Sequence, residues 1–127
     1  MSSIPKPTEA ELQILQVLWD HGPSSVRFVN DILSEIKEVG YTTTLKLMQI
    51  MAEKGIVKRD TTHRTHIYIP TVEKEVTQGN LLSSFIETTF QGSAMNLVMQ
   101  ALGNHKTTGK ELEEIKALID QIEKSQK

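Results

Sequence analysis

The sequence predicts a mainly α-helical protein that contains one small β-hairpin. Apolar residues recur at intervals of three and four over most of the 127 residues, which is the spacing of one face of a helix. Between residues 56 and 70 this spacing gives way to two short runs rich in β-branched residues, which are typical of strands. The predicted order is therefore three helices, a two-stranded hairpin and three further helices.

The first helix begins with a capping box at residues 8–11. The Thr8 hydroxyl can accept the backbone N–H of Glu11, and the Glu11 carboxylate can accept that of Thr8. Residues 21–23 (HGP) end the helix, since glycine and proline both interrupt helical backbone. Its apolar face comprises Leu12, Leu15, Leu18 and Trp19, widened by Ile14 and Val17.

Ser24 or Ser25 is expected to cap the second helix, which ends at Gly40. A third helix fits residues 42–54 and closes at Gly55. The apolar residues of the second helix are Phe28, Val29, Ile32, Leu33 and Ile36.

The hairpin is predicted from two strand-like runs, residues 56–60 and 66–70. A polar segment, residues 61–65, joins them without the Asn-Gly pair of a tight turn. Pro70 ends the second strand, because proline has no N–H to donate to a sheet.

Helical spacing returns from Glu73 and continues to the end of the chain. Breaks at residues 91–92 (QG) and 103–104 (GN) divide it into three helices, and residues 108–111 (TGKE) form a second capping box. Apolar residues on these helices include Val76, Leu82, Phe85, Ile86, Phe90, Met95, Val98, Met99, Leu102, Leu112, Ile115, Leu118, Ile119 and Ile122.

Three helices followed by a hairpin are the layout of a winged helix-turn-helix domain, in which the third helix enters the DNA major groove and the hairpin loop lies along the backbone. Projected at about 100° per residue, the helix over residues 42–54 has an apolar side and an outward side. The apolar side carries Thr44, Leu45, Leu47, Met48, Met51 and Ala52, and the outward side carries Thr42, Thr43, Lys46, Gln49, Ile50 and Glu53.

The outward side supplies the candidate DNA contacts, because threonine, lysine and glutamine can hydrogen-bond base edges or phosphates. Although the net charge is −2, residues 42–70 hold five basic and two acidic side chains, and more acidic segments flank them. Thr42, Thr43, Lys46 and Gln49 are the candidates for bases or nearby phosphates, and Lys58, Arg59, His63 and Arg64 for the backbone.

We expect residues 1–71 to form the DNA-binding domain and residues 72–127 a helical dimerisation domain. So short a helical segment has little core of its own, and pairing with a second copy would bury its apolar faces and supply the two-fold symmetry of a palindromic DNA site. The alternative is that these helices fold back on residues 1–71. The dimerisation candidates are Phe85, Ile86, Phe90, Met95, Val98, Leu102, Leu112, Ile115 and Ile119.

Several of these segments together resemble the penicillinase-repressor family of winged-helix transcription regulators. They are residues 9–19 (EAELQILQVLW), 40–49 (GYTTTLKLMQ), 53–59 (EKGIVKR), 66–70 (HIYIP), and Phe85, Phe90, Gly92, Ser93 and Leu97-Val98. The resemblance implies a homodimeric repressor of double-stranded operator DNA, bound to a promoter palindrome whose half-sites are often TACA/TGTA. It also implies that antibiotic-responsive members are inactivated through a membrane sensor and protease, and that a copper-responsive branch has a cysteine-rich tail.

The sequence departs from that family pattern in three ways. It has no cysteine, which excludes the copper-thiolate branch. Gln100-Ala101 stands where antibiotic-responsive members have the Asn-Phe bond that is cut, so an upstream sensor or protease is not implied for this chain. Ile50 stands where many relatives have arginine, so one contact with DNA is expected to be missing.

Other classes of function have little support. The four histidines complete no metal-ligand motif, and no GxSxG, phosphate-loop or GxGxxG pattern occurs, so we expect neither an enzyme nor a cofactor. The N-terminal segment lacks the pattern of a signal peptide and no apolar run reaches membrane-spanning length, so a cytoplasmic protein without a membrane partner is expected. The alternatives are a winged-helix module that binds another protein and, more remotely, a small-molecule sensor with a cavity between the C-terminal helices.

Overall fold

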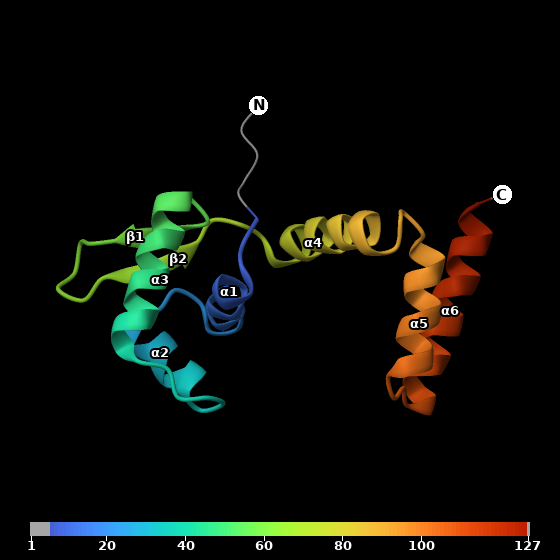
Figure 1. The fold of residues 1–127 in the computed structure, drawn as a ribbon, viewed down its shortest axis with the longest axis horizontal. Coiled ribbons are helices and arrows are strands. Elements are labelled where there is room, and N and C mark those ends of the chain that lie inside the picture. The colour runs from blue at the N-terminus through green and yellow to red at the C-terminus, as the bar shows by residue number, and fades with distance from the viewer. Residues whose placement is uncertain (1–5, 127) are drawn as a thin grey trace. The chain divides into compact units, whose positions relative to one another are not determined.

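The computed structural model describes residues 6–126 and confirms the predicted fold class (Figure 1). Residues 1–5, on which the expected lack of a signal peptide partly rests, lie outside the described part. The described residues form six helices and one antiparallel hairpin. These elements are α1 (Glu9–His21), α2 (Val26–Ser34), α3 (Tyr41–Lys54), β1 (Val57–Asp60), β2 (Ile67–Pro70), α4 (Lys74–Thr89), α5 (Ala94–Asn104) and α6 (Gly109–Ser125).

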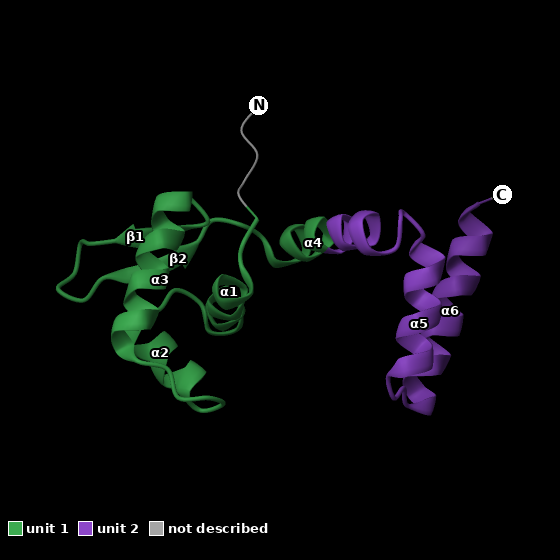
Figure 2. Cartoon of the chain, viewed as in Figure 1, with its two compact units in different colours: residues 1–81 green, residues 82–127 purple. Residues whose placement is uncertain are grey.

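The chain divides into two compact units, residues 1–81 and residues 82–127, which Figure 2 distinguishes by colour. Unit 1 contains α1 to α3, the hairpin and the first half of α4. Unit 2 contains the rest of α4 together with α5 and α6. The boundary between the units therefore falls inside a helix rather than in a loop.

Both predicted capping boxes are present. At α1 the Thr8 N–H donates to Glu11 Oε1 (3.0 Å) and the Glu11 N–H to Thr8 Oγ1 (3.2 Å). At α6 the Thr108 N–H donates to Glu111 Oε1 (2.9 Å) and the Glu111 N–H to Thr108 Oγ1 (3.0 Å). Each box satisfies two backbone donors that have no partner inside the helix.

The predicted end of the second helix is wrong, because α2 ends at Ser34 rather than at Gly40. The Ser34 hydroxyl donates to the Val39 carbonyl (3.3 Å) and accepts from the Val39 N–H (3.4 Å), closing a loop where the helix could have continued. Ile36, expected among the apolar residues of the second helix, consequently lies in this loop and is 91% exposed, and Phe28 on α2 is 38% exposed.

Unit 1 has a single hydrophobic core, to which α1, α2, α3 and the hairpin all contribute. The predicted inner face of α1 is buried at Ile14, Leu15, Val17 and Leu18, with Leu12 and Trp19 partly buried against the core. The remaining buried apolar residues are Val26, Val29, Met48, Met51, Ile56, Val57 and Tyr68.

Backbone hydrogen bonds join the hairpin to the helices. The Ser24 N–H donates to the Tyr68 carbonyl (3.1 Å) and the Tyr68 N–H to the Ser24 carbonyl (2.8 Å). This bridge adds the segment between α1 and α2 as a short third partner of the sheet. The buried Tyr68 is thereby fixed beneath the helices, and the hairpin cannot swing freely.

Unit 2 has no comparable interior. No residue of α5 or α6 is buried. At the end of α4, Gln91 and Gly92 adopt positive φ angles of 52° and 86°, and the Gly92 N–H donates to the Ile86 carbonyl (3.0 Å). This left-handed ending, predicted as a break at residues 91–92, stops α4 and turns the chain toward α5.

Candidate nucleic-acid interface

Helix α3 has the two faces that its sequence predicts. Thr44, Met48 and Met51 are completely buried, and Leu45, Leu47 and Ala52 are partly buried. On the other side the four candidate contact residues Thr42, Thr43, Lys46 and Gln49 are exposed. Ile50 is partly buried at the margin between the two faces. The helix thus presents a row of hydrogen-bonding side chains to solvent, in the position that winged-helix domains use for the major groove.

A buried asparagine fixes the turn between α2 and α3. Asn30 Nδ2 donates to the Val39 carbonyl (2.8 Å) and to Thr44 Oγ1 (2.9 Å). Asn30 is 8% exposed, so these bonds are shielded from water. Sequence reasoning missed this residue. Its signal was a polar side chain directly after Val29, on the face that packs against α3.

Residues Lys58 and Arg59 lie on β1 and are both exposed. In the antiparallel register, Lys58 is opposite Ile69 and Arg59 is opposite Tyr68. Neighbouring residues of a strand point to opposite faces. The two cations are therefore not equivalent, and a duplex lying along one face of the hairpin would meet only one of them directly.

The loop between the strands, residues 61–66, carries the other two candidates, His63 and Arg64, and both are exposed. Asp60 shapes the start of this loop by accepting the Thr62 hydroxyl (2.7 Å) and the Thr62 N–H (2.9 Å). The hydrogen bond from the Thr62 hydroxyl, followed by the one from its N–H, holds the pKa of Asp60 below its ordinary value. The charges of nearby His63 and Lys58 lower this pKa further. The Asp60 carboxylate is thus engaged in hydrogen bonds within the loop.

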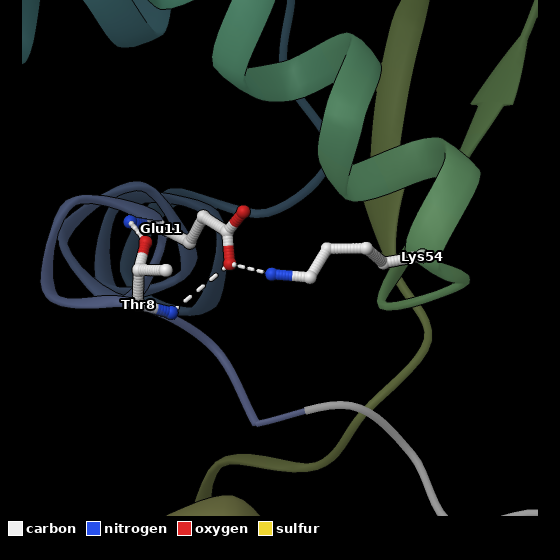
Figure 3. A network of polar contacts seen from close by, with 3 residues as sticks. All are labelled: Thr8, Glu11 and Lys54. Atoms are coloured by element: carbon white, nitrogen blue, oxygen red, sulfur yellow. Dashed lines mark hydrogen bonds and ion pairs between the residues drawn. The ribbon is translucent and has the colours of Figure 1, made fainter.

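An ion pair joins Lys54, the last residue of α3, to Glu11 in the first turn of α1 (Figure 3). Lys54 Nζ donates to Glu11 Oε1 (2.6 Å), the atom that also accepts the Thr8 N–H. Burial alone would raise the pKa of Glu11, but the hydrogen bonds from Lys54 and Thr8, with the Lys54 charge, lower it below its ordinary value. The carboxylate is therefore charged, and it holds the end of α3 against the start of α1.

The nine dimerisation candidates lie on the helical segments of unit 2. Phe85 and Ile86 belong to α4 and Phe90 follows it, and the Phe85 and Phe90 rings meet edge to face at 5.6 Å. Ile86, Phe90 and Ile115 are partly buried. The other candidates, which include Phe85, are exposed, and Met95 reaches 76%. The candidates on α5 and α6 are Met95, Val98, Leu102, Leu112, Ile115 and Ile119.

The part of the chain that the structure describes contains no cluster of three or more histidine, cysteine, aspartate or glutamate side chains placed to hold a metal. Within the same residues, no helix is both long and apolar enough to cross a lipid bilayer. The candidate site consists of the outward face of α3, the hairpin and the charged side chains on both.

The family model described as penicillinase repressor matches residues 7–121, which is nearly the whole chain. The chain belongs to the penicillinase repressor family. This confirms the resemblance inferred from the sequence. It also confirms that the protein is a transcriptional regulator and not an enzyme, because the family consists of transcriptional repressors.

Individual members of the family match over different lengths. The penicillinase repressor of Bacillus licheniformis is 25% identical over 125 residues, covering 95% of this chain and 94% of that protein. The penicillinase repressor of Staphylococcus aureus is 26% identical over 118 residues, covering 91% of each. The transcriptional regulator BlaI of Mycobacterium tuberculosis is 30% identical over 71 residues, covering 55% of this chain and 51% of that protein.

The solution structure of the DNA-binding domain of the repressor BlaI has the same fold as part of this chain. The TM-score is 0.51 at 24% identity, over 58% of this chain and 90% of that domain. This likeness identifies the winged-helix fold. Gln100 and Ala101 lie inside α5, where both residues are exposed.

Proposed function

We propose that this protein is a homodimeric transcriptional repressor that recognises a promoter palindrome with α3 and the hairpin of each unit 1. The observation that carries the proposal is the outward face of α3. Four neighbouring polar side chains, Thr42, Thr43, Lys46 and Gln49, are exposed on a helix whose opposite face is anchored in the core. A helix held in this way can read base edges in the major groove.

The hairpin supports the same proposal from a second element. Arg64 lies in the exposed loop and Lys58 and Arg59 lie on β1, so the hairpin supplies exposed cations from a second element of unit 1. Contacts of this kind with phosphates position a protein on DNA without reading sequence. We therefore assign specificity to α3 and general affinity to the hairpin.

Fluorescence anisotropy with a TACA/TGTA palindrome and a scrambled duplex, at two salt concentrations, tests this proposal. A cognate preference of about 10³ or more, with affinity falling as salt rises, is expected of a specific operator-binding protein. Equal binding to both duplexes calls for selection from random sequences. Failure to enrich any motif there would refute the proposal and favour a module that binds another protein.

Two variants separate the assigned roles. Thr43→Ala should weaken binding mainly to the cognate duplex, by about 1–3 kcal/mol, because it removes one base contact. Arg64→Ala should weaken cognate and scrambled binding by the same factor. Gln13→Ala, an exposed change on α1, is the matched control and should alter neither. Different factors for Arg64→Ala on the two duplexes would contradict the role of the hairpin loop.

The dimerisation part of the proposal rests on unit 2. Ten large apolar side chains of this unit are exposed, and no residue of α5 or α6 is buried. Exposed apolar surface of this extent indicates an interaction site. A second copy is the partner that fits, since the same surface on two chains forms a two-fold symmetric contact and a palindrome has the same symmetry.

Sedimentation equilibrium tests dimerisation directly. Ile119→Glu places a charge on the apolar side of α6 and should shift the protein from dimer to monomer. Gln121→Glu is the control, because residues 119 and 121 lie roughly on opposite sides of a helix. The monomer should bind a half-site normally and lose most of its affinity for the full palindrome. A monomeric wild type would contradict this part of the proposal and leave the assignment of α3 intact.

A further inference from the structure

A pocket of about 310 Å³ lies in unit 1 where α2, α3 and the hairpin loop meet. Arg27 of α2, Tyr41 of α3, and Arg64 and His66 of the hairpin loop contribute to its lining. Its other lining residues are Ser25, Val26, Leu45, Thr65 and Tyr68, so no carboxylate lines it. The pocket thus combines two permanent cations with polar and aromatic groups. It lies between α3 and the hairpin, the two elements proposed above to contact DNA.

Arg27 is held in place by an aromatic ring. Its guanidinium carbon lies 4.9 Å from the centroid of Tyr41. Stacking of this kind orders an arginine while leaving N–H donors at the edge of the guanidinium free for an oxyanion. Among the described residues the carboxylates within ion-pair distance of a cation are Glu11 and Glu113, whose partners are Lys54 and Lys116, so the charge of Arg27 is not neutralised by a described neighbour.

The position of Arg27 in α2 is itself informative. It is the second residue of the helix, and the first turn of α2 contains no acidic residue. A cation there is disfavoured by the partial positive charge at the N-terminus of a helix. The local energetics of α2 therefore give no reason for an arginine at this position, whereas an anion in the pocket would interact favourably with both the arginine and the helix end.

We propose that this pocket receives a backbone phosphate of the bound DNA and that Arg27, positioned by Tyr41, donates hydrogen bonds to it. The inference rests on the proposed DNA-binding function. It adds a contact from α2, an element to which no DNA contact is otherwise assigned, between the α3 contacts and the hairpin contacts. Such a contact would fix how deeply and at what angle α3 enters the groove, because it holds the duplex at a third point.

Anisotropy titrations over a range of salt concentrations test the contact with full-length protein. Arg27→Ala should weaken binding about fivefold per protomer at 0.15 M salt and reduce the slope of log K against log salt by about 0.9 per phosphate, which is about 1.8 for the two half-sites of a bound dimer. Cognate and scrambled duplexes should be affected equally. Lys37→Ala, an exposed cation beyond the other end of α2, is the control and should leave the slope unchanged.

The role of Tyr41 is tested by Tyr41→Ala and by the double variant. If the ring acts by positioning Arg27, Tyr41→Ala should weaken binding less than Arg27→Ala, and the double variant should bind as Arg27→Ala does. Duplexes carrying single methylphosphonates identify the phosphate. At one position per half-site, neutralisation should weaken the wild type and leave Arg27→Ala unaffected.

The outcomes distinguish this inference from the function on which it rests. If the wild type binds DNA and Arg27→Ala has the same affinity and salt slope, the pocket contact is refuted and the function stands. A wild type that binds no duplex refutes both. If inorganic phosphate raises the melting temperature of the wild type and not of Arg27→Ala, while DNA binding is equal in the two, the pocket serves a free phosphate ligand and the contact with DNA is wrong.

Discussion

Replacing Glu11 by glutamine should destabilise unit 1 and remove part of its sensitivity to acid. Glu11 is 2% exposed, and its Oε1 accepts hydrogen bonds from Lys54 Nζ and the Thr8 N–H. Glutamine keeps the shape, and its amide oxygen can still accept from Thr8 and Lys54, but the bond from Lys54 loses its negatively charged acceptor. A hydrogen bond to a charged group contributes about 1.5–3 kcal/mol.

The expected loss of stability lies below what breaking a fully buried ion pair costs. Removing one partner of a fully buried pair costs about 3–5 kcal/mol, because the other charge is left without a partner. The Lys54 side chain is 27% exposed and can turn to water, so the penalty is smaller. We therefore expect Glu11→Gln to lower the free energy of unfolding by about 2 kcal/mol at neutral pH. This value is the contribution of the charged hydrogen bond, reduced because Lys54 can be hydrated. For a unit of this size that lowers Tm by roughly 8–16 °C.

The pH dependence follows from the lowered pKa of Glu11. Its carboxyl has a pKa below the ordinary value of 4.5 in the folded protein, so the folded state binds the proton less readily than the unfolded state. The stabilisation is complete above the ordinary value and is lost as pH falls through the folded-state pKa. The difference in stability between wild type and Glu11→Gln should therefore be constant near neutral pH and narrow below about 4.5.

Urea unfolding followed by the fluorescence of Trp19 measures this effect. Trp19 is the only tryptophan, and its indole N–H donates to the Val72 carbonyl (3.0 Å), so its signal reports unit 1. Glu9→Gln is the matched control, since Glu9 lies exposed in the same first turn and its loss should cost only about 0.3–1 kcal/mol through the helix dipole. Equal losses for the two variants, or a wild-type advantage over Glu11→Gln that does not change with pH, would refute the reasoning.

Two further changes in unit 1 probe how α3 is held. Asn30→Ala should cost about 1–3 kcal/mol, because it leaves the buried Thr44 hydroxyl without its donor and the Val39 carbonyl with only the longer bond from Ser34, and Trp19-monitored unfolding should detect it. Asn30→Asp should be no better, and restored stability in that variant would argue against a donor role. Gly55→Ala should cost about 1 kcal/mol, because Gly55 ends α3 with φ at +84° while a Cβ there meets nothing within 4 Å. A neutral result would show that this turn relaxes without strain.

Features that depend on neighbours along the chain could be predicted from the sequence. The capping box at Thr8 and Glu11, the two faces of α3 and the break at Gly92 all follow from residues within a few positions of one another. The prediction of where α2 ends was wrong because it, too, relied only on local spacing. Ile36 continues the spacing of Ile32, but the Ser34 hydrogen bonds with Val39 decide where the helix stops. The spacing of apolar residues does not show whether side-chain hydrogen bonds to the backbone will replace those of a continued helix.

Contacts between distant residues could not be predicted. Glu11 and Lys54 are 43 positions apart, and each has an ordinary local explanation as a helix-capping acid and a cation in the last helical turn. Arg27 over Tyr41 also pairs two elements, and nothing in either segment indicates the other. The sequence could therefore indicate candidate residues on one helix face or in one loop, whereas the pocket lined by Arg27 and Tyr41 is visible only in the fold.

If the protein binds DNA as the proposed dimer, the charges of unit 1 supply a physical reason for the second copy. Of the five cations in residues 42–70, Lys54 is held by Glu11, which leaves Lys46, Lys58, Arg59 and Arg64, with Arg27 from α2. Because Lys58 and Arg59 point to opposite faces of the hairpin, the proposed interface could neutralise about four phosphates per protomer, below the 6–10 contacts that give proteins steep salt dependence. Two protomers joined through unit 2 double that number, and binding of the second becomes an intramolecular step with a high effective concentration. On the proposed function, a unit whose basic residues are confined to one segment would gain operator affinity by pairing, so the apolar surface of unit 2 would contribute to DNA binding alongside the polar face of α3.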